Sequence, residues 1–176
     1  ARFHRLRGDD VKVEFHGTDL MAGATGEARV EGKKSSVEID AHFDNLDDPT
    51  KFGLEYLSLV LWAVSPEGRA VNLGELVFDH NHSHVKAITD MQTFGLIVTA
   101  EPYFAVRIPS ELVVMENDVL RETKGRRFTV REYSLMKTAR YHKLANPLAL
   151  SPDLKSQPLD IYEARNALAI AQSNAA

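Results

Sequence analysis

The residues best suited to chemistry lie in the short run Asp79-His80-Asn81-His82-Ser83-His84. In an extended chain alternate side chains share a face, so His80, His82 and His84 would project to one side, with the carboxylate of Asp79 nearby. Neutral imidazoles with a neighbouring carboxylate bind zinc, copper or nickel. These four residues are therefore the candidates for a metal site.

The same run also fits a polar hairpin between two strands, because Asp, Asn and Ser favour turns and His tolerates them. Spacing does not reveal the outer partners that orient metal-bound imidazoles. We therefore expect a hairpin at this position, and the sequence assigns no metal and no cofactor to it.

Nucleophilic catalysis finds no supporting motif. Triads of Ser, His and Asp can be assembled on paper from His16, His42 or His142, but no Gly-x-Ser-x-Gly turn presents a nucleophile. The ten glycines are scattered, and the absence of cysteine excludes a thiol nucleophile and a Cys-ligated metal. We expect a protein that is not an enzyme.

The elements that would position these residues are β-strands. From Glu27 to Asn117 the hydrophobic pattern alternates or forms short apolar runs, broken by turn residues. The expected strands are 27–31, 36–45, 54–64, 70–78, 84–89, 94–100 and 112–116. Their number and spacing are typical of an immunoglobulin-like β-sandwich, so the predicted fold class is mainly β with that sandwich at 27–117.

Both ends of the chain differ from this core. Residues 1–26 contain an extended strand, with Val11, Val13 and Phe15 on one face, followed by a flexible loop at Gly17–Gly26. Residues 118–156 are expected to form a basic extended ribbon and linker. Residues 157–176 fit one Ala-rich C-terminal α-helix, which Ser156 can cap and whose apolar stripe includes Ile161 and Leu168.

Charge is unevenly distributed along the chain. The net charge of −4 argues against a nucleic-acid partner held by phosphate contacts. It combines +6 between Arg121 and Lys143, a stretch that includes Arg126, Arg127 and Arg131, with −10 on the remainder. The basic stretch is therefore expected to dock on an acidic neighbour, since complementary charge sets register between surfaces.

Two runs carry a resemblance to a known family: FGLEYLSLVLWAVSPEGRAVNLGEL at 52–76 and FGLIVTAEPYFAVRIPSELVVMEN at 94–117. They resemble a largely uncharacterised family of secreted bacterial envelope proteins. In that family a similar β-domain precedes an Ala-rich helix, like YEARNALAIAQSNAA at 162–176, and often a peptidoglycan-binding module like that of outer-membrane protein A. Tyr56–Trp62 and Val98–Pro102 are less closely similar to the extracytoplasmic domain of anti-sigma-K factors.

The resemblance implies a secreted or cell-envelope location and leaves a cell-wall association open, and it carries over no catalytic residue. No apolar run approaches the length of a membrane-spanning helix, and the first residues lack the apolar core of a signal peptide. We therefore expect the mature form of an exported protein.

The N-terminal strand, the basic stretch and the C-terminal helix are expected to lack a partner within 27–117. We therefore predict a structural subunit of an extracellular bacterial filament or surface assembly, joined to other copies of itself by strand addition and tail docking. The predicted contacts between subunits are Val11, Val13, Phe15, Arg126, Arg127, Arg131, Ile161 and Leu168.

The alternative is a monomeric periplasmic binding or adaptor module that recognises a wall polymer or a protein partner. This alternative predicts an aromatic-lined concave pocket and an N-terminal strand that pairs within its own chain.

Overall fold

The computed structural model describes residues 3–5, 10–119, 127–128, 135 and 137–141. Its strands are β1 (Phe3–Arg5), β2 (Asp10–Gly17), β3 (Thr25–Gly32), β4 (Val37–Asp44), β5 (Ser58–Val64), β6 (Ala70–Glu75), β7 (Phe78–Asp79), β8 (His82–Thr89), β9 (Thr93–Glu101), β10 (Val113–Val119) and β11 (Arg127–Phe128). One turn of 3-10 helix, η1 (Pro49–Phe52), begins after Asp48, whose carboxylate accepts the N–H of Thr50.

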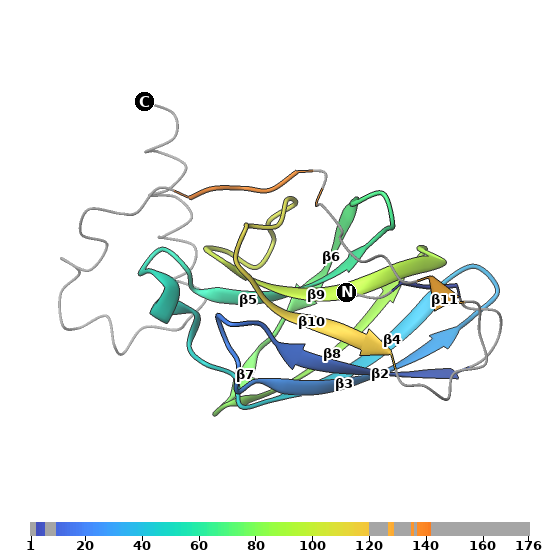
Figure 1. Ribbon diagram of the computed structural model, residues 1–176, viewed down its shortest axis with the longest axis horizontal. Helices are drawn as coiled ribbons and strands as arrows, with labels where there is room; N and C mark the ends of the chain where they lie inside the picture. The colour runs from blue at the N-terminus through green and yellow to red at the C-terminus, as the bar shows by residue number, and fades with distance from the viewer. Residues whose placement is uncertain (1–2, 6–9, 120–126, 129–134, 136, 142–176) are drawn as a thin grey trace.

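The strands form one curled antiparallel sheet (Figure 1). Its main path runs β11-β1-β9-β10-β2-β3-β4-β8-β7, and off this path β5 pairs with β9 and β6 pairs with β5. In the view of Figure 1 the part with β5, β9 and β10 lies above the part with β2, β3, β4 and β8. β6 lies beside β8 without pairing with it, so the sheet curls almost back onto itself.

The core fills the inside of this curl. In β4 the residues Val37, Ile39, Ala41 and Phe43 are buried, and the residues between them face outward. Phe15 of β2 packs its ring edge against the ring of Phe43, with centroids 4.9 Å apart. Burying an aliphatic or aromatic side chain of this size stabilises the fold by about 1.5–3 kcal/mol, so the alternating strands are held firmly by their inner faces.

β5 is buried on both faces, as its continuous apolar run suggests. On the outer side Trp62 and Ile97 form a second apolar cluster, against which Val106 and Leu135 pack. The indole N–H of Trp62 donates to Oγ1 of Thr99 at 2.8 Å. Segments that follow β9 in the sequence therefore cover this side of the sheet.

The N-terminal strand pairs within its own chain. β2 is hydrogen-bonded to β3 on one side and to β10 on the other. Val11, Val13 and Phe15 are only 8%, 2% and 4% exposed and belong to the chain's own core. The premise that this strand cannot bury its apolar face within its own chain is therefore wrong.

The limits of two predicted strands differ most from the structure. The strand expected from Leu54 begins at Ser58, because the preceding residues turn and the N–H of Tyr56 donates to the carbonyl of Gly53 at 3.0 Å. The strand expected over 70–78 divides into β6 and β7 at Leu76 and Val77, the latter 66% exposed.

The mainly β class is confirmed. An immunoglobulin-like sandwich is not confirmed, because hydrogen bonding joins the described strands into one curled sheet. The helix predicted over 157–176 and the linker from 142 onward lie outside the described residues. In the part of the chain that is described, no helix has the length and apolar character of a membrane span.

Candidate metal centre

The outer face of β4 and β8 brings together two histidines and an aspartate. The strand register places His42 directly opposite His84, and Asp40 lies two residues before His42 on the same face. The inner neighbours Ala41 and Val85 are buried in the core. The three polar side chains are therefore carried by paired strands whose other face is anchored by packing.

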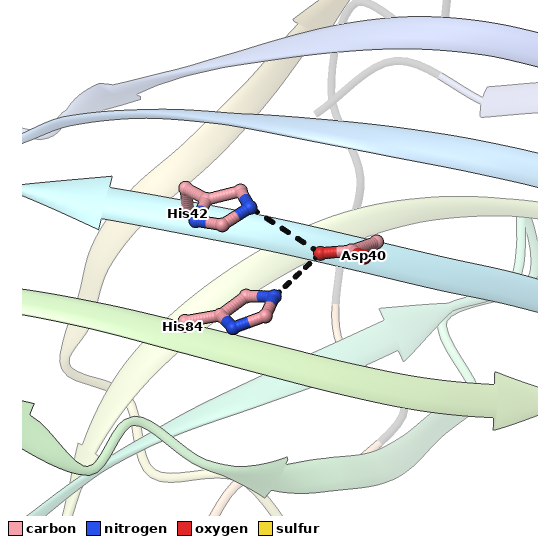
Figure 2. A group of neighbouring side chains, drawn as sticks. All are labelled: Asp40, His42 and His84. Atoms are coloured by element: carbon pink, nitrogen blue, oxygen red, sulfur yellow. Dashed lines mark hydrogen bonds and ion pairs between the residues drawn. The ribbon is translucent and has the colours of Figure 1, made fainter.

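Both imidazoles face the carboxylate of Asp40 (Figure 2). Nε2 of His84 lies 2.6 Å from Oδ1 of Asp40, and Nε2 of His42 lies 3.4 Å from the same oxygen. The two rings stack with centroids 4.1 Å apart and planes within 4° of parallel. Two imidazole nitrogens and one carboxylate oxygen thus converge on one point of the surface.

The electrostatic setting keeps the carboxylate ionised. The hydrogen bond from His84 and, to a lesser extent, Lys86 hold the pKa of Asp40 below its usual range. Nζ of Lys86 lies 3.3 Å from Oδ2, the oxygen that the imidazoles leave unused. Side-chain exposure is 40% for Asp40, 58% for His42 and 45% for His84, so the group is open to water and to solutes.

The arrangement matches the donor set of a borderline divalent metal. The three ligand atoms all lie within 4.8 Å of one another. Tetrahedral zinc with bonds of about 2.0–2.1 Å separates its donors by about 3.3 Å, so small side-chain rotations suffice. Imidazole nitrogens with a carboxylate oxygen suit zinc, copper and nickel. Three protein ligands leave at least one coordination position facing solvent.

The structure divides the four residues that the sequence named as metal candidates. His84 belongs to the cluster. His80 lies in the two-residue turn between β7 and β8, with φ at 59°, and contacts the Asp79 carboxylate at 3.0 Å. His82 bonds Asp44 instead, at 2.5 Å. The polar hairpin expected here is confirmed, and its turn is what separates His80 from His84.

Sequence reasoning missed Asp40 and His42 as partners of His84. A signal was present, because both residues fall on the polar face of the strand predicted over 36–45. Only the pairing of β4 with β8 brings that face to His84. A sequence separation of more than forty residues hides this relation from any local pattern.

A groove of about 710 Å³ borders Asp40. Its lining includes Arg29, Lys86, Leu73 and Ile88 and contains no aromatic side chain. It therefore differs from the aromatic-lined pocket predicted for a module that recognises a wall polymer or a protein partner.

The predicted subunit contacts are placed only in part. Val11, Val13 and Phe15 lie in the core, and Arg127 begins β11, which pairs with β1. Arg126, Arg131, Ile161 and Leu168 lie outside the described residues.

Comparison of the chain with models of known protein families, with curated proteins and with solved structures finds no match.

Proposed function

We propose that this chain is a non-enzymatic binding module that takes up a divalent transition-metal ion, zinc, copper or nickel, through Asp40, His42 and His84. One observation carries the proposal: two imidazole nitrogens from adjacent, core-anchored strands face the same ionised carboxylate oxygen. Ligands on paired strands are held more precisely than ligands on loops.

The charge balance of the site supports a cation. The two Nε2 atoms face the same carboxylate oxygen, and an imidazole binds a metal through a ring nitrogen that carries no proton, the proton then lying on the other ring nitrogen. A carboxylate that is already ionised needs no further deprotonation. Lys86 stays on the far oxygen, where it can hold the carboxylate in place.

A binding role fits the surroundings better than a catalytic one. A reaction site has to hold its substrate and exclude water from the reacting groups. Here the three side chains stand about half exposed on an open sheet face. Such a position suits capture of an ion from solution.

Metal titration of the purified chain by calorimetry tests this proposal. We expect one zinc ion per chain, and we expect His84→Ala to bind about 100-fold more weakly, because one of three protein ligands is lost. His80→Ala is the matched control, since His80 lies on the same hairpin, outside the cluster, and its ring pairs with the carboxylate of the neighbouring Asp79. Equal weakening in both variants, or no stoichiometric binding, contradicts the proposal.

Assembly into a filament or surface array is a second proposal, supported by the edges of the curled sheet. Among the described strands none pairs with the second edge of β8 beyond Ser83, and β6 lies beside it without hydrogen bonds. Unpaired edges of this kind accept strands from other chains. β2 is an internal strand and is not free to be donated to another copy. In this proposal the contact between copies is therefore the open edge of β8.

A further inference from the structure

Glu101, the last residue of β9, has a fully buried carboxyl group with two different oxygens. It is 0% exposed. Its Oε1 accepts hydrogen bonds from Oγ1 of Thr99 at 2.5 Å and from the N–H of Ser110 at 2.6 Å. Its Oε2 is buried without a hydrogen-bond partner. One oxygen is therefore saturated with donors, and the other is available to carry a proton.

Rigid elements hold this carboxyl group in place. Trp62 donates to Thr99, which donates in turn to Glu101, so a chain of hydrogen bonds crosses from β5 to β9. On the other side the hydroxyl of Ser110 donates to the carbonyl of Ala100 at 2.7 Å. The carboxyl group cannot turn away from its site without breaking this chain.

A returning segment of the chain, residues 137–141, docks beside Glu101. Ala139 forms a parallel bridge with Ser110, and its N–H donates to the carbonyl of Pro109 at 2.8 Å. Nε of Arg140 donates to the carboxylate of Glu111 at 2.8 Å. Tyr141 packs its ring edge against Tyr56 and interacts with the carboxyl group of Glu101.

This segment belongs to the basic stretch that the sequence predicted to dock on an acidic neighbour. Its described part does so within the chain, on Glu101 and Glu111. The contact with Glu111 is an exposed ion pair, whereas the contact with Glu101 is buried. Exposed pairs of this kind contribute at most about 1 kcal/mol, so the buried carboxyl group has the greater influence on docking.

We propose that Glu101 is a proton-controlled docking site, which holds residues 137–141 through Tyr141 while its carboxyl group is neutral and releases them when the group ionises.

The direction follows from burial. Burial raises the pKa of Glu101 to about 7, although the hydrogen bonds from Thr99 and Ser110 and the nearby hydroxyl group of Tyr141 oppose this rise. Once the segment leaves, water reaches the carboxyl group and its pKa falls toward the ordinary value. The docked form therefore holds one more proton, and docking is strongest at acid pH and is lost as the pH rises through about 7.

The other charged groups around the carboxyl group do not reverse this direction. Glu55 and Glu111 are acidic and disfavour a second negative charge near them, and Glu111 is paired with Arg140. Burial raises the pKa of Tyr56 and of Tyr141, so both phenols stay neutral across the range in which Glu101 titrates.

Trypsin cleavage after Lys137 and Arg140, followed by mass spectrometry at pH 6 and pH 8.5, tests the proposal. The matched variant is Glu101→Gln, a permanently neutral isostere whose oxygen accepts from Ser110 and whose amide can donate toward Tyr141. We expect the wild type to be cut faster than Glu101→Gln at both pH values, and the ratio of the two rates to grow about tenfold between pH 6 and pH 8.5. The ratio between the proteins cancels the pH dependence of the protease.

Glu111→Gln is the control for the exposed ion pair, and it should speed cleavage by the same factor at both pH values. A ratio between wild type and Glu101→Gln that does not change with pH overturns the proposal. If Glu101→Gln does not fold, hydrogen exchange of the Ala139 amide in the wild type at the two pH values tests the proposal. The amide of Leu46 is the reference, because it too donates to the carbonyl of a loop residue. If the exchange rates of the Ala139 and Leu46 amides change by the same factor between the two pH values, the proposal is overturned as well.

Discussion

Gly26 in β3 occupies a position where the sheet leaves no room for a side chain. A Cβ there would lie 2.7 Å from the Phe43 ring and 2.8 Å from the carbonyl of His42. Gly26→Ala should lower the free energy of unfolding by about 1–3 kcal/mol, because Phe43 is packed in the core and cannot yield freely.

The control for this prediction is Gly23→Ala. A Cβ at Gly23 meets nothing within 4 Å, so this change should leave stability unaltered or raise it by about 0.4–1 kcal/mol. Urea denaturation measures both variants. Losses of equal size would show that the loss of glycine's backbone freedom, rather than the contact with Phe43, decides the effect at Gly26.

The residues of the metal centre show how far sequence patterns reach at this scale. A run of histidines drew attention to His84, and the alternation of 36–45 placed Asp40 and His42 on an outward face. The pattern contains no information on which strand lies beside which. The cluster exists because β4 and β8 pair in one register, and a shift by one residue would turn these side chains into the core.

At the scale of elements, the place of β2 changes what a truncation should do. Deleting residues 1–16 removes a strand from between β3 and β10 and uncovers core residues such as Phe43. We expect the truncated chain to be unfolded, with the emission of Trp62 shifted to that of an indole in water. A folded monomer lacking these residues would contradict the pairing of β2 within its own chain.

The control is a deletion of residues 1–9, which keeps β2 whole. This variant should stay folded by circular dichroism, because the paired length of β2 and its contacts with β3 and β10 remain.

The strands themselves could be predicted more reliably than their limits or their arrangement. Alternation identifies β3 and β4 almost to the residue, since one face of each is wet. The start of β5 could not be predicted, because the apolar residues before Ser58 form a turn although their pattern continues that of the strand. The curl could not be predicted either, since strands buried on both faces fit a sandwich or a curled sheet equally well.

At the scale of the whole molecule, the open edge of β8 is the place where copies would join. Ile88 is 68% exposed on this strand, and a charge on an edge strand opposes strand addition. We expect wild-type oligomers in light scattering and filaments in negative-stain images, and a monomer for Ile88→Lys.

Val77→Lys is the matched control, since Val77 is equally exposed at 66% but lies outside the strands. This variant should assemble as the wild type does. Assembly that Val77→Lys abolishes and Ile88→Lys leaves intact would exclude the β8 edge as the contact.

The hydrogen bond from Trp62 to Thr99 has a practical consequence. The sequence contains a single tryptophan, so all indole emission from this chain comes from a ring that is one hydroxyl group away from Glu101. The ring is fully buried, and no other indole contributes to its emission. The fold thus contains its own optical reporter, which lies at the carboxyl group whose protonation is in question and requires no label.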